Sequence, residues 1–430
     1  MLFTMMLVLV RPPSNISLFL YSIEWYRGHT KGFEFNILHY IGVGLVIGAL
    51  IRKQKPIFLL PGVGIYCIHI LASSLSIFGA YEPIYALMGT WKFGMVLFVG
   101  MGVCLTIQDE KDIRCILMAC ATALIINVLV CLKFRYVDGL FQVHGWFEHQ
   151  NPMAMWSYSL GLPLLAVSLS KEISFKDSLF FLMGYGAAGL SIALSASRAS
   201  TAIIGAGTII LLSASFLRGV TIRRVGVLFL ITLAGSAVLY KVMDTIIERF
   251  ETSESTDENS MRWVMIEQSK FMFNSSPAVG IGWNNFGIAN SRPRGVECSK
   301  IIENWTAETK GYTVDPKRFY RNALTESHYW LILAETGYLG FVTFILFLLT
   351  TLYWCLRCIW YYRKSTLGFL CLGIGLTLFI MYLHGQLERI LTQKKNVCSW
   401  MIFLGIMMRI ELWRRQKRPP ELWDDSQQTK

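Results

Sequence analysis

Runs of apolar residues alternate with short polar connections along most of the chain, and one polar stretch of 84 residues, Asp244 to Ser327, interrupts this alternation. Each run has roughly the 17 to 25 residues that a helix needs to cross the apolar core of a bilayer. The pattern therefore predicts an all-α, polytopic membrane protein with about 12 transmembrane helices. We expect these helices near residues 2–22, 35–51, 57–79, 85–107, 115–132, 153–170, 178–197, 199–217, 225–243, 328–356, 365–384 and 397–413.

The predicted helices divide the chain into four parts. Transmembrane helices 1 to 9 would occupy residues 1–243, a large loop residues 244–327, helices 10 to 12 residues 328–413, and a charged tail residues 414–430. The first apolar run is the weakest of the twelve because an arginine and two prolines interrupt it. It has no small-residue cleavage site of the kind that ends a signal peptide, so we expect it to be retained.

The large loop contains a pattern of its own. Its segment Met261–Phe273 has apolar residues at helical spacing, and Ser260 before it is a plausible N-cap. Pro277, Gly280 and Gly282 then favour turns. The loop is therefore expected to form short helices that lie on one face of the membrane.

Composition and charge support a membrane protein and suggest its orientation. The chain is 54% hydrophobic and only 16% charged, with a mean hydropathy of +0.46, whereas soluble domains carry about 25% charged residues. The formal net charge of +12 comes largely from Lys and Arg in alternate connections. The positive-inside rule then places both termini in the cytoplasm and the large loop outside. This charge reflects membrane topology, so we expect no nucleic-acid partner.

Two arginines occupy positions that call for an explanation. Arg198 lies between two apolar runs, among the small residues from Ser195 to Thr201, and Arg262 opens the helix expected in the loop. An arginine at a membrane boundary is costly unless it reaches water, pairs or serves a site. Arg198 could be an interfacial anchor and Arg262 part of a solvated helix face. Alternatively, both guanidinium groups bind phosphate oxygens, which match their planar geometry.

His328 begins the tenth predicted helix, directly after the polar stretch, and Glu326 precedes it by two residues. A histidine at such a boundary is either an interfacial side chain bonded to loop backbone or a general base that exchanges protons near neutral pH. The general base would remove the proton from an acceptor hydroxyl.

Aromatic and amide side chains gather in the connection before the sixth predicted helix. The segment His144–Pro152 holds Trp146, His149 and Asn151, which suit a lip that faces a sugar and equally an interfacial aromatic belt. Its two histidines do not have the spacing of a zinc-binding helix, so we expect neither a metal nor a cofactor. Three polar residues at the outer end of the eleventh run or just after it could line the same site mouth as His328: His384, Glu388 and Arg389.

Several of these segments, in this order, resemble the bacterial O-antigen ligase and O-antigen polymerase superfamily of membrane glycosyltransferases. The matching segments are Gly145–Pro152, Ser195–Ala199, Arg262–Trp263, Ser276–Gly287 and Glu326–Gly340. No single segment is specific to this superfamily. The order of the segments, together with the large loop before the histidine, is more specific. The chain departs from many relatives in one place, where Tyr329 follows the histidine instead of Asn.

The resemblance implies a metal-independent, inverting transfer of a glycan en bloc from undecaprenyl diphosphate to an acceptor hydroxyl, at the periplasmic face of the bacterial inner membrane. Arg198 and Arg262 would hold the donor diphosphate and His328 would act as the base. Lipid A–core is the favoured acceptor, as in lipopolysaccharide biosynthesis. An O-antigen or exopolysaccharide polymerase and a protein O-oligosaccharyltransferase are the alternatives on the same skeleton. A transporter is more distant, because it would place its ionisable groups within the spans.

Overall fold

The computed structural model describes residues 18–23, 26, 28–52, 60–236, 240, 258–289 and 324–419. These residues are almost entirely helical, apart from a two-stranded antiparallel hairpin of β1 (Leu18–Ser22) and β2 (Gly32–Phe35). The helices, in chain order, are α2 (Ile37–Ile51), α3 (Val63–Ser74), η3 (Leu75–Gly79), α4 (Pro83–Thr106), α5 (Glu110–Tyr136), α6 (Gln150–Ser168), α7 (Phe175–Ser195), α8 (Arg198–Leu217), α10 (Glu258–Ser275), α11 (Phe286–Ala289), α14 (His328–Tyr361), α15 (Thr366–His384), η4 (Ile390–Thr392) and α16 (Lys394–Arg415).

Seven helices among the described residues are long and apolar enough to cross a membrane: α4, α5, α7, α8, α14, α15 and α16. They indicate a multi-pass membrane protein. The predicted all-α class is therefore confirmed in this coarser form. The twelve transmembrane helices of the prediction are not found in the described part of the chain.

Three of the predicted helix ranges, 2–22, 57–79 and 397–413, differ from the structure in their bounds or continuity. The end of the run 2–22 is a strand, since Leu18–Ser22 pairs with β2, and the rest of that run lies outside the described residues. The described part of the run 57–79 forms two short pieces, α3 and η3. The run 225–243 is helical from residue 222 to 236, and most of its remaining residues lie outside the described part of the chain. The last helix continues to Arg415, two residues into the predicted tail.

The predicted helix of the large loop is present but begins earlier. α10 starts at Glu258, so Ser260 lies inside the helix and is not its N-cap. The apolar spacing from Met261 onward therefore identified the helix, whereas the capping pattern placed its start wrongly.

α14 is two helices joined at a sharp break. Gly337 has φ 61° and ψ −165°, which is outside the helical region and is reached easily only by glycine. The two segments fold back on each other, because the ring of His328 lies 5.3 Å, centroid to centroid, from the ring of Phe344. The single helix predicted over residues 328–356 is therefore wrong in shape: its first part turns back against its second.

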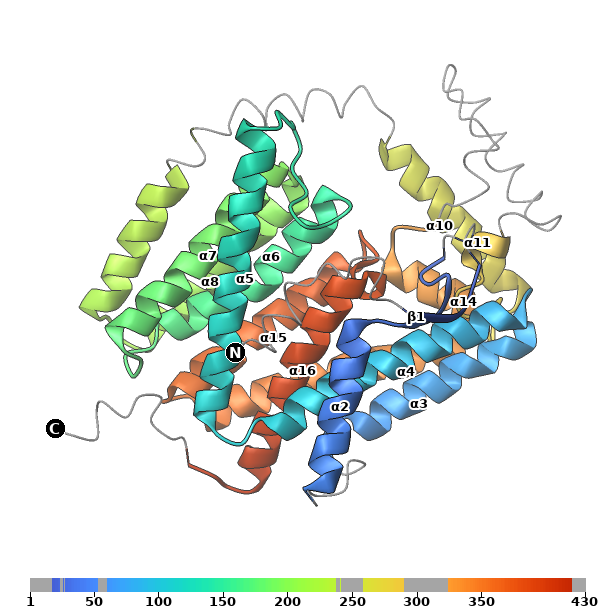
Figure 1. The fold of residues 1–430 in the computed structure, drawn as a ribbon, viewed down its shortest axis with the longest axis horizontal. Coiled ribbons are helices and arrows are strands. Elements are labelled where there is room, and N and C mark those ends of the chain that lie inside the picture. Colours follow the sequence, from blue (N-terminus) through green and yellow to red (C-terminus); the bar gives the residue numbers. More distant parts are fainter. Residues whose placement is uncertain are drawn as a thin grey trace.

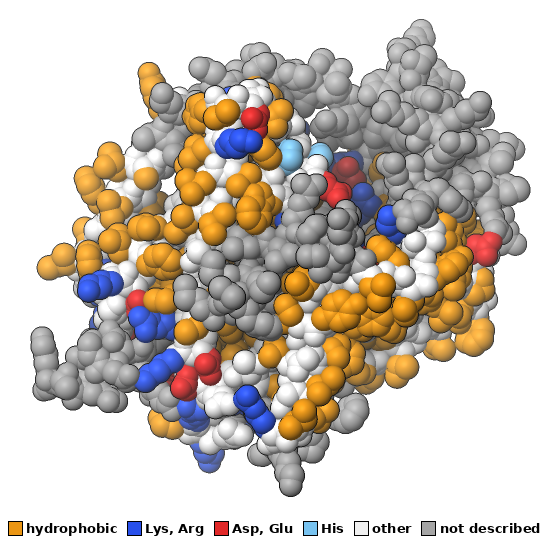
Figure 2. All heavy atoms as spheres, in the orientation of Figure 1, with side chains coloured by type: hydrophobic (Ala, Val, Ile, Leu, Met, Phe, Trp, Pro, Cys, Tyr) orange, Lys and Arg blue, Asp and Glu red, His pale blue; other side chains and the backbone are white. Residues whose placement is uncertain are grey.

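The helices form two groups with a third between them (Figure 1). One group contains α2, α3 and α4, and the other contains α5 to α8. The third group consists of α14, α15 and α16. Contacts of α14 with α3, of α16 with α4 and of α15 with α6 join the groups. Figure 2 shows hydrophobic side chains over the outer surfaces of both groups, with a small set of histidine and charged side chains between them near the upper middle. This distribution suits a protein whose sides face lipid.

The ends of the helices meet on one side of the molecule. Lys395 at the start of α16 donates to Trp146 O before α6 (2.6 Å), His328 N at the start of α14 donates to Gly385 O after α15 (2.8 Å), and Tyr81 N before α4 donates to Ile281 O (3.3 Å). α7 and α8 meet at Ala196, at the same end as the start of α6, because α7 packs antiparallel to α6. We call this side the loop face.

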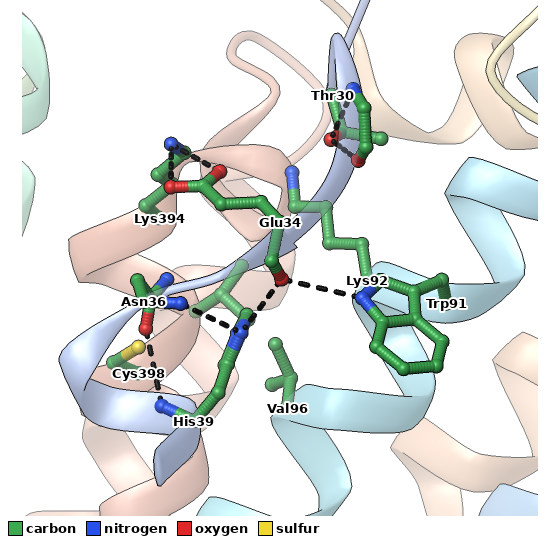
Figure 3. A pocket seen from close by; sticks show the side chains of 11 residues that line it. Thr30, Glu34, Asn36, His39, Trp91, Lys92, Val96, Lys394 and Cys398 are labelled. Atoms are coloured by element: carbon green, nitrogen blue, oxygen red, sulfur yellow. Dashed lines mark hydrogen bonds and ion pairs between the residues drawn. The ribbon is translucent and has the colours of Figure 1, made fainter. Parts of the chain in front are cut away.

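The hairpin is fixed to the loop face by buried charges (Figure 3). Glu34 on β2 pairs with Lys394 at the start of α16, at 2.5 Å between Oε2 and Nζ, and its carbonyl accepts from Trp91 Nε1. Lys92 on α4 is buried and donates to the carbonyls of His29 (2.8 Å) and Thr392 (2.6 Å). One buried ammonium group thus connects the hairpin loop to the segment after α15.

Candidate functional site

Charged side chains from three separate parts of the chain meet on the loop face. Arg262 of α10 donates from Nε to Glu326 Oε2 at 2.6 Å, and its Nη2 lies 3.8 Å from Glu388 Oε1. Asn151, at the start of α6, donates from Nδ2 to the same Glu388 oxygen at 2.9 Å. We call Asn151, Arg262, Glu326 and Glu388 the arginine–carboxylate cluster. Its arginine is reachable from solvent, since 40% of the side chain is exposed.

The local fold explains how the cluster is held. Glu388 follows α15 in a turn in which the amides of Leu387 and Glu388 both donate to His384 O at 2.9 Å. Asn151 lies in the first turn of α6, where His149 is the N-cap and accepts from Asn151 N through Nδ1 at 3.3 Å. Two helix ends therefore fix the carboxylate and the amide, whereas α10 supplies the arginine.

Glu388 has the strongest electrostatic perturbation in the cluster. Burial, followed by repulsion from Glu326, raises the pKa of Glu388 to about 7, against the opposing effects of Arg262, Asn151 and Arg389. Only 13% of its side chain is exposed. Burial has the opposite effect on the neighbouring Arg389, whose pKa it lowers, although the carboxylates of Glu388 and Glu326 oppose that shift. The cluster thus contains a carboxyl that exchanges its proton near neutral pH.

His328 lies beside the cluster but its ring points into the protein. The residue is 1% exposed, and neither ring nitrogen has a hydrogen-bond partner among the described residues. Its neighbours are aromatic, with Phe344 at 5.3 Å and Tyr329 at 6.2 Å between ring centroids. A buried imidazole without partners is costly, so both nitrogens are available to a polar ligand that enters this space.

Arg198 is the first residue of α8 and is exposed. The turn before it is tight, with Ala196 in the left-handed region at φ 53° and Ser197 hydrogen-bonded to Ser200 through the side-chain oxygens (3.2 Å). The start of α8 belongs to the loop face. Arg198 thus shares a side of the protein with the cluster, but no described contact joins it to Arg262 or His328.

The remaining predicted residues are divided between the mouth and the core. Trp146 is half-buried and accepts from Lys395 through its carbonyl, while His149 is exposed. His384 is buried, and its Nδ1 is hydrogen-bonded to Tyr158 OH at 3.0 Å. The structure therefore brings together Asn151, Arg262 and Glu326, places Trp146 and His149 nearby, and turns His384 toward α6.

No group of three or more His, Cys, Asp or Glu side chains in the described ranges has the arrangement of a metal site.

The comparisons with known proteins leave the family open. No protein-family model matches the chain, and no curated protein matches it.

The position of Glu388 at the centre of the cluster is not evident from the sequence. From the sequence, Glu388 is expected only to line the mouth together with His384 and Arg389, and no partner is predicted for it. Its contacts come from α10 and α6, more than a hundred residues away in the sequence, and no spacing pattern encodes them. The only available signal was a Glu–Arg pair directly after an apolar run, next to a predicted membrane boundary.

Proposed function

We propose that the protein is a membrane glycosyltransferase that transfers a glycan from undecaprenyl diphosphate to an acceptor hydroxyl, of the O-antigen ligase type, with lipid A–core as the acceptor. The observation that carries the proposal is the arrangement on the loop face. A half-exposed Arg262 stands beside the start of α14, where neither ring nitrogen of a buried histidine has a hydrogen-bond partner among the described residues. The ordered resemblance of the sequence segments supports the same chemistry.

In the proposed reaction, Arg262 and Arg198 bind the diphosphate of the donor. The acceptor oxygen attacks the anomeric carbon, the bond from that carbon to the diphosphate breaks, and undecaprenyl diphosphate leaves with the bonding electrons. Negative charge grows on the leaving oxygen, and a preorganised guanidinium stabilises it without a metal. The configuration at the anomeric carbon inverts, because no covalent glycosyl intermediate is formed.

We assign the acceptor's proton to His328. Its ring has no acidic partner among the described residues and is buried, which favours the neutral form that can accept a proton. Two backbone connections support a role of His328 near the donor. Glu326, which precedes His328 by two residues, pairs with Arg262. The amide of His328 donates to Gly385 O, in the turn that carries Glu388. The base and the diphosphate ligand are thus connected through two short pieces of backbone.

We further propose that the loop face is the periplasmic face of a bacterial inner membrane, with both termini in the cytoplasm. The support is the excess of Lys and Arg in the connections on the opposite side, such as Arg218, Arg223 and Arg224 after α8. A donor that reaches the periplasm on its lipid would then present its diphosphate at the depth of the helix ends.

The test is transfer by the purified protein in detergent, with an undecaprenyl-diphosphate-linked glycan as donor. Lipid A–core is the acceptor in one reaction, and the second contains the donor alone. A glycan on lipid A–core that is absent with Arg262→Ala, Arg198→Ala and His328→Ala is expected. Elongated lipid-linked glycan from the donor alone would assign a polymerase instead, and no product in either reaction would overturn the transferase.

A further inference from the structure

The arginine that the proposed function assigns to the donor diphosphate already faces two anions from its own chain. Glu326 occupies the Nε side of the Arg262 guanidinium at 2.6 Å, and Glu388 stands 3.8 Å from Nη2. With both carboxylates ionised, their two negative charges balance the positive charges of Arg262 and the neighbouring Arg389, so no excess positive charge is left for a further anion. An entering phosphate oxygen would then meet repulsion from the protein itself.

The two carboxylates are held differently. The Glu326 side chain is 38% exposed and makes the short contact, whereas that of Glu388 is 13% exposed and is farther from the arginine. Glu388 Oε1 is kept in place by Asn151 Nδ2 at 2.9 Å. The Nη2 edge of Arg262 is therefore the edge that an external anion can take, provided that Glu388 loses its charge.

We propose that Glu388 is a positioning residue that closes the Arg262 site to phosphate or diphosphate groups when it is ionised and opens the site when it takes up a proton. The proposal rests on the proposed function, which makes Arg262 the ligand of the diphosphate. It adds a proton-linked control that the transferase chemistry does not require.

The groups around Glu388 act on its pKa in opposite directions, and burial together with Glu326 outweighs the rest. Glu326, from the segment before α14, favours the protonated carboxyl by repulsion, and burial acts in the same direction to place the pKa of Glu388 at about 7. Arg262 from α10 and Arg389 from its own turn favour the ionised form, as does the Asn151 amide. The His384 ring, at the end of α15, is turned to Tyr158 and makes no described contact with Glu388. The carboxyl therefore changes its charge between pH 6 and pH 8.

The size of the effect follows from linkage. If an anion binds only the protonated form of Glu388, affinity falls by about tenfold between pH 6 and pH 8 for a group that titrates at 7. The same proton would be taken up when the donor binds and returned when the product leaves. Release of undecaprenyl diphosphate would then be helped by the carboxylate that re-forms at Glu388.

Sulfate is a suitable first probe, because its charge does not change between pH 6 and pH 8. We would titrate sulfate into the full-length protein in detergent at both pH values by calorimetry. The wild-type protein is expected to bind about tenfold more weakly at pH 8. Glu388→Gln, which resembles the protonated form, should bind at pH 8 as tightly as the wild type does at pH 6. A Glu388→Gln protein that keeps the wild-type pH dependence would overturn the proposal.

Two further variants separate this proposal from its premise. Glu267→Gln removes an exposed carboxylate of α10 that pairs with Lys270 outside the cluster, and it should leave sulfate binding unchanged. Arg262→Ala should lose sulfate binding at both pH values. If Arg262→Ala binds sulfate normally, the diphosphate assignment of the proposed function fails. If it loses binding while Glu388→Gln behaves as wild type, only the control by Glu388 fails.

The source of the anion is tested by competition against bound sulfate. Undecaprenyl diphosphate in detergent is expected to displace sulfate at a lower concentration than pyrophosphate does, because the lipid adds contacts beside the helices. Equal displacement by the two would assign the site to free diphosphate and overturn a lipid-linked ligand.

Discussion

His29 Nε2 and Glu335 Oε2, from residues 306 positions apart in the chain, lie 2.5 Å from each other inside the protein. The Glu335 carboxylate also accepts from the backbone amides of Asn284 (3.0 Å) and Phe286 (2.9 Å). One buried side chain therefore joins the hairpin loop, the segment after α10 and the first part of α14. All three border the loop face.

Removing this carboxylate is expected to destabilise the loop face. Glu335→Ala leaves two buried amides and the His29 ring without their acceptor, and breaking a buried pair of this kind costs about 3 to 5 kcal/mol. The measurement is the thermal unfolding temperature in detergent. Glu267→Ala, which removes the exposed pair with Lys270, should change stability by less than about 1 kcal/mol. Equal effects of the two substitutions would mean that the buried contacts of Glu335 contribute little.

Substitution of Gly337 tests the break in α14. A Cβ at this position would lie 2.6 Å from the Ala278 carbonyl and from Gly280 N, and the backbone conformation is one that other residues adopt at a cost of about 1 to 3 kcal/mol. Gly337→Ala should therefore lower the unfolding temperature and disturb the position of His328. Gly186→Ala in α7, where a Cβ meets nothing within 4 Å, should be neutral or slightly stabilising. A stable, fully active Gly337→Ala protein would contradict the fold-back.

Stability should depend on pH through Glu388. Its pKa rises from an ordinary 4.5 to about 7 on folding, mainly through burial. The folded protein then binds the proton more tightly than the unfolded chain, so the associated stability is complete below about pH 4.5 and is lost as the pH rises through 7. The difference is at most about 3 kcal/mol. Unfolding temperatures of wild type and Glu388→Gln at pH 5 and pH 8 check this, and the variant should be the more stable protein only at pH 8.

His328→Ala should abolish transfer while donor binding survives. The imidazole is assigned to the proton of the acceptor, so its loss should lower kcat by about two to four orders of magnitude with little change in the affinity for undecaprenyl diphosphate. Single-turnover transfer and equilibrium binding of the donor lipid are the two measurements. Loss of both together, with a lower unfolding temperature, would identify His328 as a structural residue.

Chelators should leave transfer unchanged. The proposed reaction relies on guanidinium groups for the leaving charge, and the described residues contain no group of side chains arranged as a metal site. Transfer with and without EDTA is the measurement. Inhibition that an added divalent ion reverses would contradict the two-arginine mechanism.

The helical class was predictable because the length of each apolar run can be counted in the sequence. α5, α7, α8 and α15 fall close to their predicted ranges, since each is a continuous apolar run bounded by polar connections. The failures have a common physical reason. Apolar length does not separate one straight helix from two helices that meet at a glycine, and Gly337 stands within an otherwise continuous run. Nor does it separate a short strand from a weak helical run, as at Leu18–Ser22.

The candidate site was predictable residue by residue but not as an arrangement. Arg262, Glu326, Asn151 and Glu388 could be identified as polar groups at a membrane boundary, but the contacts of Glu388 with Arg262 and Asn151 could not. Tertiary contacts between α6, α10 and the turn after α15 depend on how helices pack, and one sequence gives no register for that packing. The inward direction of the His328 ring follows from the same fold-back at Gly337 and was equally hidden.

α6 has no lipid-facing surface, because its residues from Met153 to Ser168 are all buried. It contains serines at three of those positions, and it is not among the helices apolar enough to cross a membrane unaided. Such a segment gains little from entering hydrocarbon alone. In the folded protein α6 packs against α7 and α8, which are made directly after it, and against α15, which is made much later. A nascent chain that stops after α8 therefore leaves α6 without the surface of α15 that covers it in the folded protein, so α6 is fully enclosed only once α15 has been made.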